Sequence, residues 1–207
     1  MKKRTLEILE ILDNLYGTER VCYLNHENAW QLLIATILSA QCTDARVNIV
    51  TNDLFKKYTS IEAFANADLS ELENDIKPAG FYHNKAKNII NCCKKLHYDF
   101  NDKVPESIEE LTSLDGVGRK TANVIRGNIY GIDSIVVDTH VKRISNKLKL
   151  TKESDPVKIE FDLMKALPKE HWILYNIQII TFGRDICKAV NPDCERCPLT
   201  KYCSYHK

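Results

Sequence analysis

Four cysteines crowd together near the end of the chain. Cys187, Cys194, Cys197 and Cys203 follow the spacing C-x6-C-x2-C-x5-C. Four thiolates this close in sequence can converge on one metal centre, and the Asn-Pro-Asp and Cys-Pro steps between them suit the turns of such a loop. A set of four cysteines suits zinc and an iron–sulfur cluster alike, and a single Cys-x-x-Cys pair leans only slightly toward iron–sulfur. The tail is therefore predicted to bind a metal, with chance clustering or two disulfides as the minor alternatives.

A second group of residues with chemical potential surrounds Gly116-Val117-Gly118. Two glycines one residue apart permit a tight turn and a close approach of the backbone to another molecule. The helical pattern that follows would direct its first N–H groups into that gap, where a phosphate is the natural occupant. Lys120 falls in the first turn of this helix, where the dipole disfavours a cation and so favours the neutral, nucleophilic amine. Taken alone, the pattern favours the simpler interpretation that Arg119 and Lys120 are solvated or contact phosphate.

Asp138 follows a short β-branched run at residues 135–137, which is the best strand candidate in the chain but too short to define a sheet. As an isolated residue, Asp138 is more simply interpreted as the N-cap of the helix that begins at Thr139. A carboxylate beside a nucleophilic lysine can instead take its proton or stabilise a developing cation. Asp138 is therefore a candidate partner for Lys120.

The elements that must position these residues are helices. Nearly every segment has helical periodicity and none shows the sustained alternation of a strand, so the fold is predicted to be all-α. An apolar stripe from Leu6 ends at Gly17, and Asn28 can cap a strongly apolar central helix through Gln41. A helix from 83 to 100 is expected to carry its lysines on its surface: Lys85, Lys87, Lys94 and Lys95. The other helix starts are placed at Thr43 or Asp44, Ser60, Ser70, Ser107, Asp155 and Pro168.

Composition bounds the remaining possibilities. The 207 residues are 44% hydrophobic, which is ample for one large domain or two lobes. The net charge of +1 creates no overall field that would attract nucleic acid, so any basic surface must be local. The longest apolar run, at 29–40, is too short for a bilayer, and the basic start at 1–4 does not lead into an apolar signal core. We expect a soluble, cytoplasmic protein, associated with the nucleoid if it is bacterial.

Five stretches, two of which contain Lys120 and Asp138, stand in order along the chain. They are Leu-Ser-Ala-Gln-Cys-Thr-Asp at 38–44, Gly-Phe-Tyr-His-Asn-Lys-Ala at 80–86, Leu-Asp-Gly-Val-Gly-Arg-Lys-Thr-Ala at 114–122, Val-Asp-Thr-His-Val at 137–141 and Phe-Gly-Arg at 182–184. Together with the tail cysteines they resemble the endonuclease III group of helix-hairpin-helix DNA glycosylases. The resemblance covers essentially the whole chain, from about the first helix to Cys203, and its motifs are several and correctly spaced.

This resemblance implies a fold of two α-helical lobes. Residues 22–132 would form a helical barrel with the DNA-binding hairpin, and residues 1–21 plus 133–207 would form the second lobe with the cluster loop at 187–203. The cysteines match the family's [4Fe-4S] ligands one for one, which decides between iron–sulfur and zinc by analogy. The partner would be double-stranded DNA with a damaged pyrimidine or an abasic site, and the protein is expected to act as a monomer.

The resemblance also implies an activity, which is the removal of oxidised or damaged pyrimidines through a lysine Schiff base, followed by strand cleavage 3′ to the abasic site. Lys120 would be the nucleophile and Asp138 its helper. Gln41 would fill the space left by the base, and Phe81 would be an apolar wedge, with core packing as an equal alternative. DNA contacts would come from residues 116–119, namely Gly116, Val117, Gly118 and Arg119, and from Lys188.

The loop between Cys187 and Cys194 departs from the family pattern, because relatives tend to be more basic there. Lys188 is the strong candidate for a DNA contact within it, and Arg184, Arg196 and Lys201 could compensate. Three rival functions remain at this point. An adenine or mismatch glycosylase would generally lack the hairpin lysine, a non-catalytic DNA-binding module would need no carboxylate, and an electron-transfer protein would make the hairpin incidental.

Overall fold

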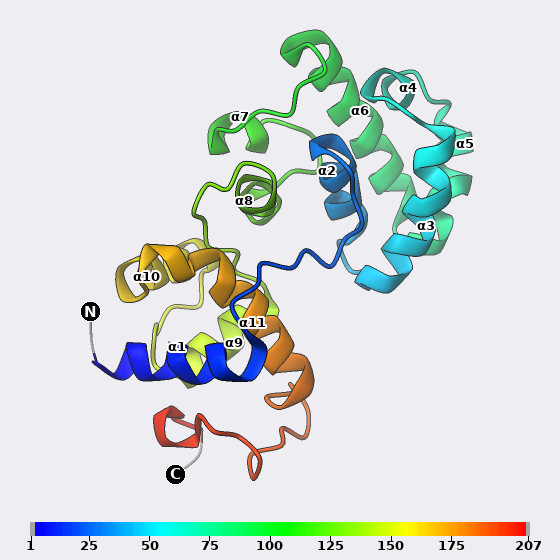
Figure 1. The fold of residues 1–207 in the computed structure, drawn as a ribbon. Helices are drawn as coiled ribbons and strands as arrows, with labels where there is room; N and C mark the ends of the chain where they lie inside the picture. The colour runs from blue at the N-terminus through cyan, green and yellow to red at the C-terminus, as the bar shows by residue number, and fades with distance from the viewer. Residues whose placement is uncertain (1–2, 206–207) are drawn as a thin grey trace. The chain divides into compact units, whose positions relative to one another are not determined.

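The computed structural model describes residues 3–205, and its regular structure within that range is helical throughout (Figure 1). This confirms the all-α prediction. No helix in the described range is long and apolar enough to cross a membrane. The elements in chain order are α1 (Lys3–Tyr16), α2 (Ala29–Leu38), α3 (Asp44–Lys57), α4 (Ile61–Ala65), α5 (Leu69–Ile76), η1 (Lys77–Ala79), α6 (Tyr82–Phe100), α7 (Ile108–Thr112), α8 (Arg119–Asn128), α9 (Thr139–Lys147), α10 (Pro156–Ala166), η2 (Lys169–His171), α11 (Trp172–Asp185) and η3 (Thr200–Tyr202).

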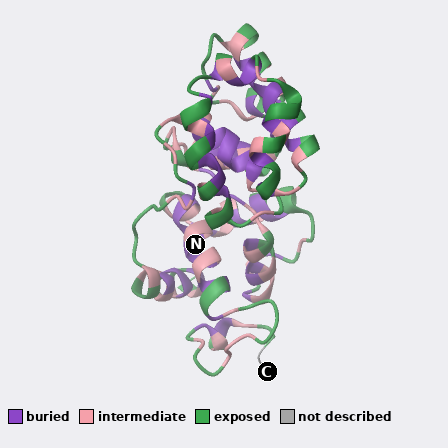
Figure 2. Ribbon diagram, turned by 90° about the vertical axis from the view of Figure 1, so that its right-hand side faces the viewer, coloured by how far each residue is buried: buried purple, intermediate pink, exposed green. Residues whose placement is uncertain are grey.

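The chain divides into two compact units. Unit 1 comprises Met1–Val21 and Asp133–Lys207, of which the structure describes residues 3–21 and 133–205, and unit 2 comprises Cys22–Ile132. Each unit has its own hydrophobic core, and buried residues line the inner sides of its helices (Figure 2). In sequence, unit 2 is therefore inserted between two parts of unit 1.

Unit 2 is organised around α2, whose residues from Gln31 to Leu38 are all buried. This helix packs against α3, α6 and α8. It begins at Asn28, whose side chain accepts a hydrogen bond from the N–H of Gln31 at 3.1 Å. It ends at Leu38, so the prediction of a helix through Gln41 is wrong. Gln41 has a left-handed backbone, with φ of 54°, which no α-helix can contain.

Most of the N-caps in the structure are the residues that the sequence predicts. The side chains of Thr43, Ser60, Ser107 and Asp155 each accept a hydrogen bond from the third N–H that follows, as the predicted starts of α3, α4, α7 and α10 require. Two predicted starts are wrong. Asp68, and not Ser70, caps α5, and η2 lies between Pro168 and the start of α11 at Trp172.

Unit 1 packs α1 and α9 against α11. Its core includes Ile8 and Leu12 from α1 and Tyr175, Ile179 and Phe182 from α11. The β-branched run at 135–137 forms no strand. Instead, the carbonyl oxygen of Val136 accepts a hydrogen bond from Nδ2 of Asn176 at 3.0 Å, so a side chain occupies the position that a partner strand would take.

Candidate functional site

The hairpin between α7 and α8 is anchored by three buried apolar residues, Leu111, Leu114 and Val117. The turn itself depends on Gly116, which has φ of 76°, a conformation that favours glycine. A Cβ atom at this position would also lie 3.0 Å from Cβ of Asn88 on α6. Both the backbone conformation and the packing therefore require glycine at Gly116.

Gly118 is glycine for a different reason. Its φ of −89° suits any residue, and a Cβ atom there would meet nothing within 4 Å. A side chain would therefore fit at this position, and glycine instead leaves the backbone accessible to another molecule. Gly118 is also the N-cap of α8 and supplies no side chain to the first N–H groups of that helix. The hairpin thus exposes the positive end of a ten-residue helix.

Lys120 is the second residue of α8 and is exposed. Within unit 2 its amine makes no hydrogen bond or ion pair, so it is available to a ligand of the hairpin. Arg119, one residue earlier, is half-buried. An exposed lysine thus lies two residues after the open backbone at Gly118. The predicted roles of these residues in catalysis and DNA binding stay predictions.

Gln41 and Phe81 lie in two short turns of unit 2 with the same unusual backbone. Both residues have a left-handed conformation, with φ of 54° for Gln41 and 50° for Phe81. Non-glycine residues rarely adopt it, and it concentrates at functional sites. Phe81 is 63% exposed, so the alternative of core packing is wrong. The side chain of Phe81 is therefore not part of the hydrophobic core of unit 2, and its role as a wedge stays a prediction.

Asp138 is the N-cap of α9 in unit 1. Its Oδ1 accepts a hydrogen bond from the N–H of Val141 at 2.7 Å, which confirms the capping interpretation. Among the residues of unit 1 that the structure describes, none donates a hydrogen bond to Oδ2 of this half-buried carboxylate. One oxygen of the carboxylate thus has a structural role, and the catalytic role of Asp138 stays a prediction.

His140 follows in the first turn of α9 and packs on Gly183 of α11. A Cβ atom at Gly183 would lie 2.3 Å from Nδ1 of the histidine, so the close approach of these helices requires glycine. Burial lowers the pKa of His140, and the positive charges of Arg143 and Arg184 lower it further, against the opposing effect of Asp138. The imidazole beside Asp138 is therefore held in its neutral form more firmly than a free histidine.

The four tail cysteines are half-buried, and none is in a disulfide. Burial raises the pKa of the Cys187 and Cys197 thiols, and the nearby Cys194 and Cys203 raise it further, so the four cysteines lie in one neighbourhood. Among residues 3–205, no three metal-binding side chains meet as they would around a single ion. A donor set of four thiols with no nitrogen or carboxylate ligand fits an iron–sulfur cluster, in which each iron takes one thiolate.

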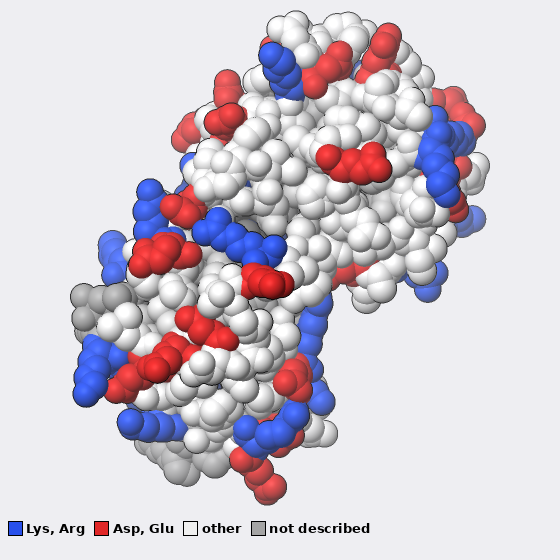
Figure 3. Space-filling model, viewed as in Figure 1, with Lys and Arg blue, Asp and Glu red and all other residues white. Residues whose placement is uncertain are grey.

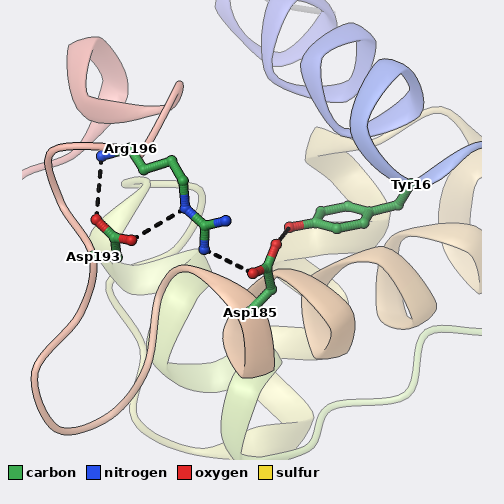
Figure 4. Close-up of polar contacts among 4 residues, drawn as sticks. All are labelled: Tyr16, Asp185, Asp193 and Arg196. Atoms are coloured by element: carbon green, nitrogen blue, oxygen red, sulfur yellow. Dashed lines mark hydrogen bonds and ion pairs between the residues drawn. The ribbon is translucent and has the colours of Figure 1, made fainter.

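Two basic residues of the loop after Cys187, Lys188 and Arg196, differ in whether they pair with carboxylates. Arg196 pairs with Asp185 at 2.8 Å and with Asp193 at 3.1 Å, and Tyr16 donates a hydrogen bond to Asp185 at 3.2 Å (Figure 4). The predicted compensating role of Arg196 therefore loses support, because its guanidinium already faces two carboxylates. Lys188, in contrast, is exposed and pairs with no carboxylate among the described residues. On the face shown in Figure 3, acidic and basic side chains are interspersed, in keeping with the small net charge.

One residue with a structural role was misplaced by the sequence prediction. Lys85 was expected on the surface of α6, but it is buried, with 5% of its surface exposed. Helical spacing could have indicated this, because Lys85 lies four residues before the buried Ile89 and eight before the buried Cys93.

Comparisons with known proteins agree with this geometry. Residues 34–169 match the HhH-GPD superfamily of base excision DNA repair proteins, and residues 187–203 match the iron–sulfur binding domain of endonuclease III. The chain is 49% identical to the endonuclease III of Synechocystis over 98% of its own length and 92% of that protein. It is 46% identical to the endonuclease III of Bacillus subtilis over 88% of its own length and 84% of that protein.

Solved structures give the same result. The fold matches a structure described as a trapped endonuclease III–DNA covalent intermediate, with a TM-score of 0.92 and 42% identity over 99% of this chain and 97% of the other. A thermostable thymine-DNA glycosylase shares the fold, with a TM-score of 0.87 at 22% identity over 99% of this chain and 97% of the other. The tail therefore carries a [4Fe-4S] cluster. The chain belongs to the endonuclease III family of base excision DNA repair enzymes, which are bifunctional DNA glycosylases with abasic-site lyase activity.

Proposed function

We propose that the chain removes damaged pyrimidines from duplex DNA, with the amine of Lys120 as the nucleophile. The observation that carries this proposal is the exposed lysine in the first turn of α8, two residues after the sterically open Gly118. A trapped covalent intermediate with DNA is described for a protein 42% identical to this one, which supports an amine that bonds to the substrate. A glycosylase that acts only through water would need no amine at this position.

Binding would begin at the DNA backbone. The N–H groups at Gly116, Val117 and Gly118 and at the start of α8 would hold a phosphate near the lesion, aided by the positive end of the helix dipole. A base inside the stack cannot be attacked, so the damaged nucleotide must leave the duplex. Gln41 would then fill the vacated space, and Phe81 would act as an apolar wedge. The exposure of Phe81 supports this role, because the protein core does not use the side chain.

The chemistry follows from a neutral amine. Nζ of Lys120 attacks C1′ of the extruded nucleotide, the C1′–N bond breaks, and the base leaves with the electron pair and takes up a proton. The nitrogen then loses a proton, the C1′–O4′ bond breaks with O4′ taking up a proton, and a Schiff base forms between Lys120 and C1′. The imine acidifies the C2′ proton, whose removal breaks the C3′–O bond and expels the 3′ phosphate. Water then hydrolyses the imine and releases the lysine.

Asp138 would assist the first step. Its Oδ1 caps α9, and that hydrogen bond fixes the orientation of the carboxylate. The other oxygen can accept the proton that the attacking amine loses, or stabilise the positive charge that develops on the sugar as the base departs. A cap alone would require no aspartate, since asparagine and serine serve equally well.

The four cysteines would ligate the [4Fe-4S] cluster, one thiolate to each iron. Base removal is a substitution with no net electron transfer, so the cluster has no redox step to perform in it. Its role would be to fix the tail and to present the loop with Lys188 to the DNA backbone. Lys188 is suited to this contact because no carboxylate neutralises it within the described residues.

The test is borohydride trapping on a duplex oligonucleotide with a single thymine glycol. Wild type, Lys120→Ala and the control Lys94→Ala, an exposed lysine of α6, would be compared. We expect a covalent adduct with the wild type and the control, and none with Lys120→Ala, which should still bind the duplex. Adducts with all three proteins would assign the chemistry to another amine. Loss of binding by Lys120→Ala would make the residue a phosphate contact instead.

A further inference from the structure

Lys85 occupies an unusual position in unit 2. It lies in the first turn of α6 and is buried, with 5% of its surface exposed. Its Nζ donates one hydrogen bond to the carbonyl oxygen of Leu38 at 2.9 Å and another to that of Ala79 at 2.8 Å. Among residues 22–132, all of which the structure describes, no carboxylate pairs with it. A buried ammonium group without a counter-charge is unfavourable unless its hydrogen bonds are well made, so these two bonds define its role.

The two acceptors explain why a cation is stable here. Leu38 is the last residue of α2, and Ala79 is the last residue of η1. Carbonyl groups at the end of a helix lack donors within that helix and carry the negative end of its dipole. One ammonium nitrogen has three donors and can satisfy both carbonyls at once. Lys85 thereby joins two segments of chain that are 41 residues apart (79 − 38).

Each of these segments leads directly into a residue of the proposed DNA interface. Gln41 follows Leu38 by three residues, and Phe81 follows Ala79 by two. Both have left-handed backbones and exposed side chains. Such a conformation is unfavourable for a non-glycine residue and persists where the surrounding structure fixes it. The hydrogen bonds of Lys85 fix the start of one turn and the start of the other.

We propose that Lys85 is a positioning residue, whose ammonium group holds the turns that bear Gln41 and Phe81 as one rigid element so that both side chains enter the duplex together. This inference rests on the proposed function, in which Gln41 fills the vacated space and Phe81 acts as the wedge. An apolar residue in place of Lys85 would leave two buried carbonyls without donors, and each turn could then move independently. Insertion into the stack would suffer, while the chemistry at Lys120 would not.

The experiment compares Lys85→Met with a matched control, Lys94→Met, which makes the same change at an exposed lysine of α6. Two substrates separate insertion from chemistry. The first is a duplex with one thymine glycol beside a 2-aminopurine, whose fluorescence reports unstacking. The second is a single-stranded oligonucleotide with an abasic site, which can form the Schiff base without insertion into a stack. Single-turnover rates are measured on both at saturating enzyme.

We expect Lys85→Met to lower the fluorescence change and to slow excision from the duplex by about 10- to 100-fold, as displaced positioning groups do. Schiff-base formation on the single strand should stay within about three-fold of wild type, a change smaller than one typical catalytic contact. The control should match wild type on both substrates. Equal losses of Lys85→Met on both substrates would indicate general disruption and overturn the proposal. Unchanged duplex excision would overturn it as well.

A second measurement does not depend on the folding of Lys85→Met. Gln41 and Phe81 are exposed, so Gln41→Ala, Phe81→Ala and the double variant should fold normally. If one rigid element carries both side chains, their effects on duplex excision must be non-additive. Additive effects would overturn the role of Lys85 even if Lys85→Met failed to fold. If neither single variant changes excision, the proposed function of Gln41 and Phe81 fails instead, and the two failures are thus distinguishable.

Discussion

Arg143 donates a hydrogen bond from Nη2 to the carbonyl oxygen of Cys187 at 2.8 Å. The arginine lies on α9, the helix that Asp138 caps, and the cysteine is the first residue of the metal-binding tail. This bond ties the helix of a proposed catalytic carboxylate to the cluster loop within unit 1. A cluster held by this loop would therefore also help to fix the helix that carries Asp138.

Arg143→Met should weaken the hold of the protein on its cluster. The variant keeps the length of the side chain and removes the donor, which leaves the carbonyl of Cys187 without this partner. We expect faster loss of the visible absorbance of the cluster in the presence of a chelator and a lower thermal midpoint. Arg196→Met offers a matched control, because its charge pairs at the surface and such pairs contribute little. Equal cluster loss in both variants would contradict the role of the Arg143 bond.

Asp138→Asn separates the two functions of this residue. Asparagine caps a helix as well as aspartate does, so the thermal midpoint should stay close to that of wild type. Base release should slow by about 100-fold or more, because the amide can neither accept a proton nor stabilise a cation as a carboxylate does. Single-turnover excision of thymine glycol and thermal unfolding would be measured together. Unchanged turnover with an intact fold would leave Asp138 as a helix cap only.

The two glycines of the hairpin should respond differently to alanine. Gly116→Ala places a Cβ 3.0 Å from Asn88 in a backbone with φ of 76°, so the protein should lose about 1 kcal/mol or more of stability. Gly118→Ala meets nothing within 4 Å and should fold normally. Its DNA affinity should fall nonetheless, because the new methyl group obstructs the close approach of a phosphate. Thermal unfolding and fluorescence anisotropy with a labelled duplex would measure the two effects. Undiminished affinity of Gly118→Ala would exclude a phosphate contact at that position.

The salt dependence of DNA binding should distinguish Lys188 from Arg196. Each phosphate neutralised by a protein cation contributes about 0.9 to the slope of log affinity against log salt. Lys188→Ala should make that slope shallower by about this amount. Arg196→Ala should leave the slope nearly unchanged, because the guanidinium already pairs with Asp185 and Asp193. Binding would be measured by anisotropy across a salt series, and a shallower slope for Arg196→Ala alone would reverse the assignment.

The lowered pKa of His140 makes unit 1 sensitive to mild acid. The unfolded chain takes up a proton near the usual histidine value of 6.5, while the folded protein resists it because His140 is buried. The unfolded state then binds more protons, so stability is fully present above that value and falls as the pH drops below it. Urea unfolding at several pH values would show this slope, and His140→Gln should reduce it. An identical slope in the variant would assign the acid sensitivity to other groups.

Much of the fold could be predicted because helix starts have local chemistry. The side chains at Asn28, Thr43, Ser107 and Asp138 accept hydrogen bonds from N–H groups only three residues away, so the sequence alone contains the whole interaction. The end of α2 could not be predicted in this way. No glycine or proline marks it, and the left-handed Gln41 follows by three residues the carbonyl of Leu38, which Lys85 binds from 47 residues away.

The candidate site, too, could be predicted only where its features depend on residues that are close in sequence. The glycine turn and the four cysteines are local patterns whose chemistry follows from residue types at short spacing. Of the two ion pairs of Arg196, the one with Asp193 could be predicted, because Asp193 is only three residues away. The other partner, Asp185, is brought close only by the path of the tail after α11. Long polar side chains at the surface choose partners by tertiary position, which short motifs do not encode.

The insertion of unit 2 within unit 1 sets an order of events during synthesis on the ribosome. Residues 22–132 emerge as an uninterrupted segment and can complete their core before α11, which packs against α1, has been synthesised. Nη2 of Arg4 binds the carbonyl oxygens of Leu148 and Tyr202, each at 2.6 Å, and the second of these is among the last described residues to emerge. The contacts of Arg4 can therefore be completed only after residue 202 has left the ribosome, later than the core of unit 2. A nascent chain that stalls before residue 187 would thus carry a finished hairpin with Lys120, but neither the four cysteine ligands nor the hydrogen bond between Arg4 and Tyr202.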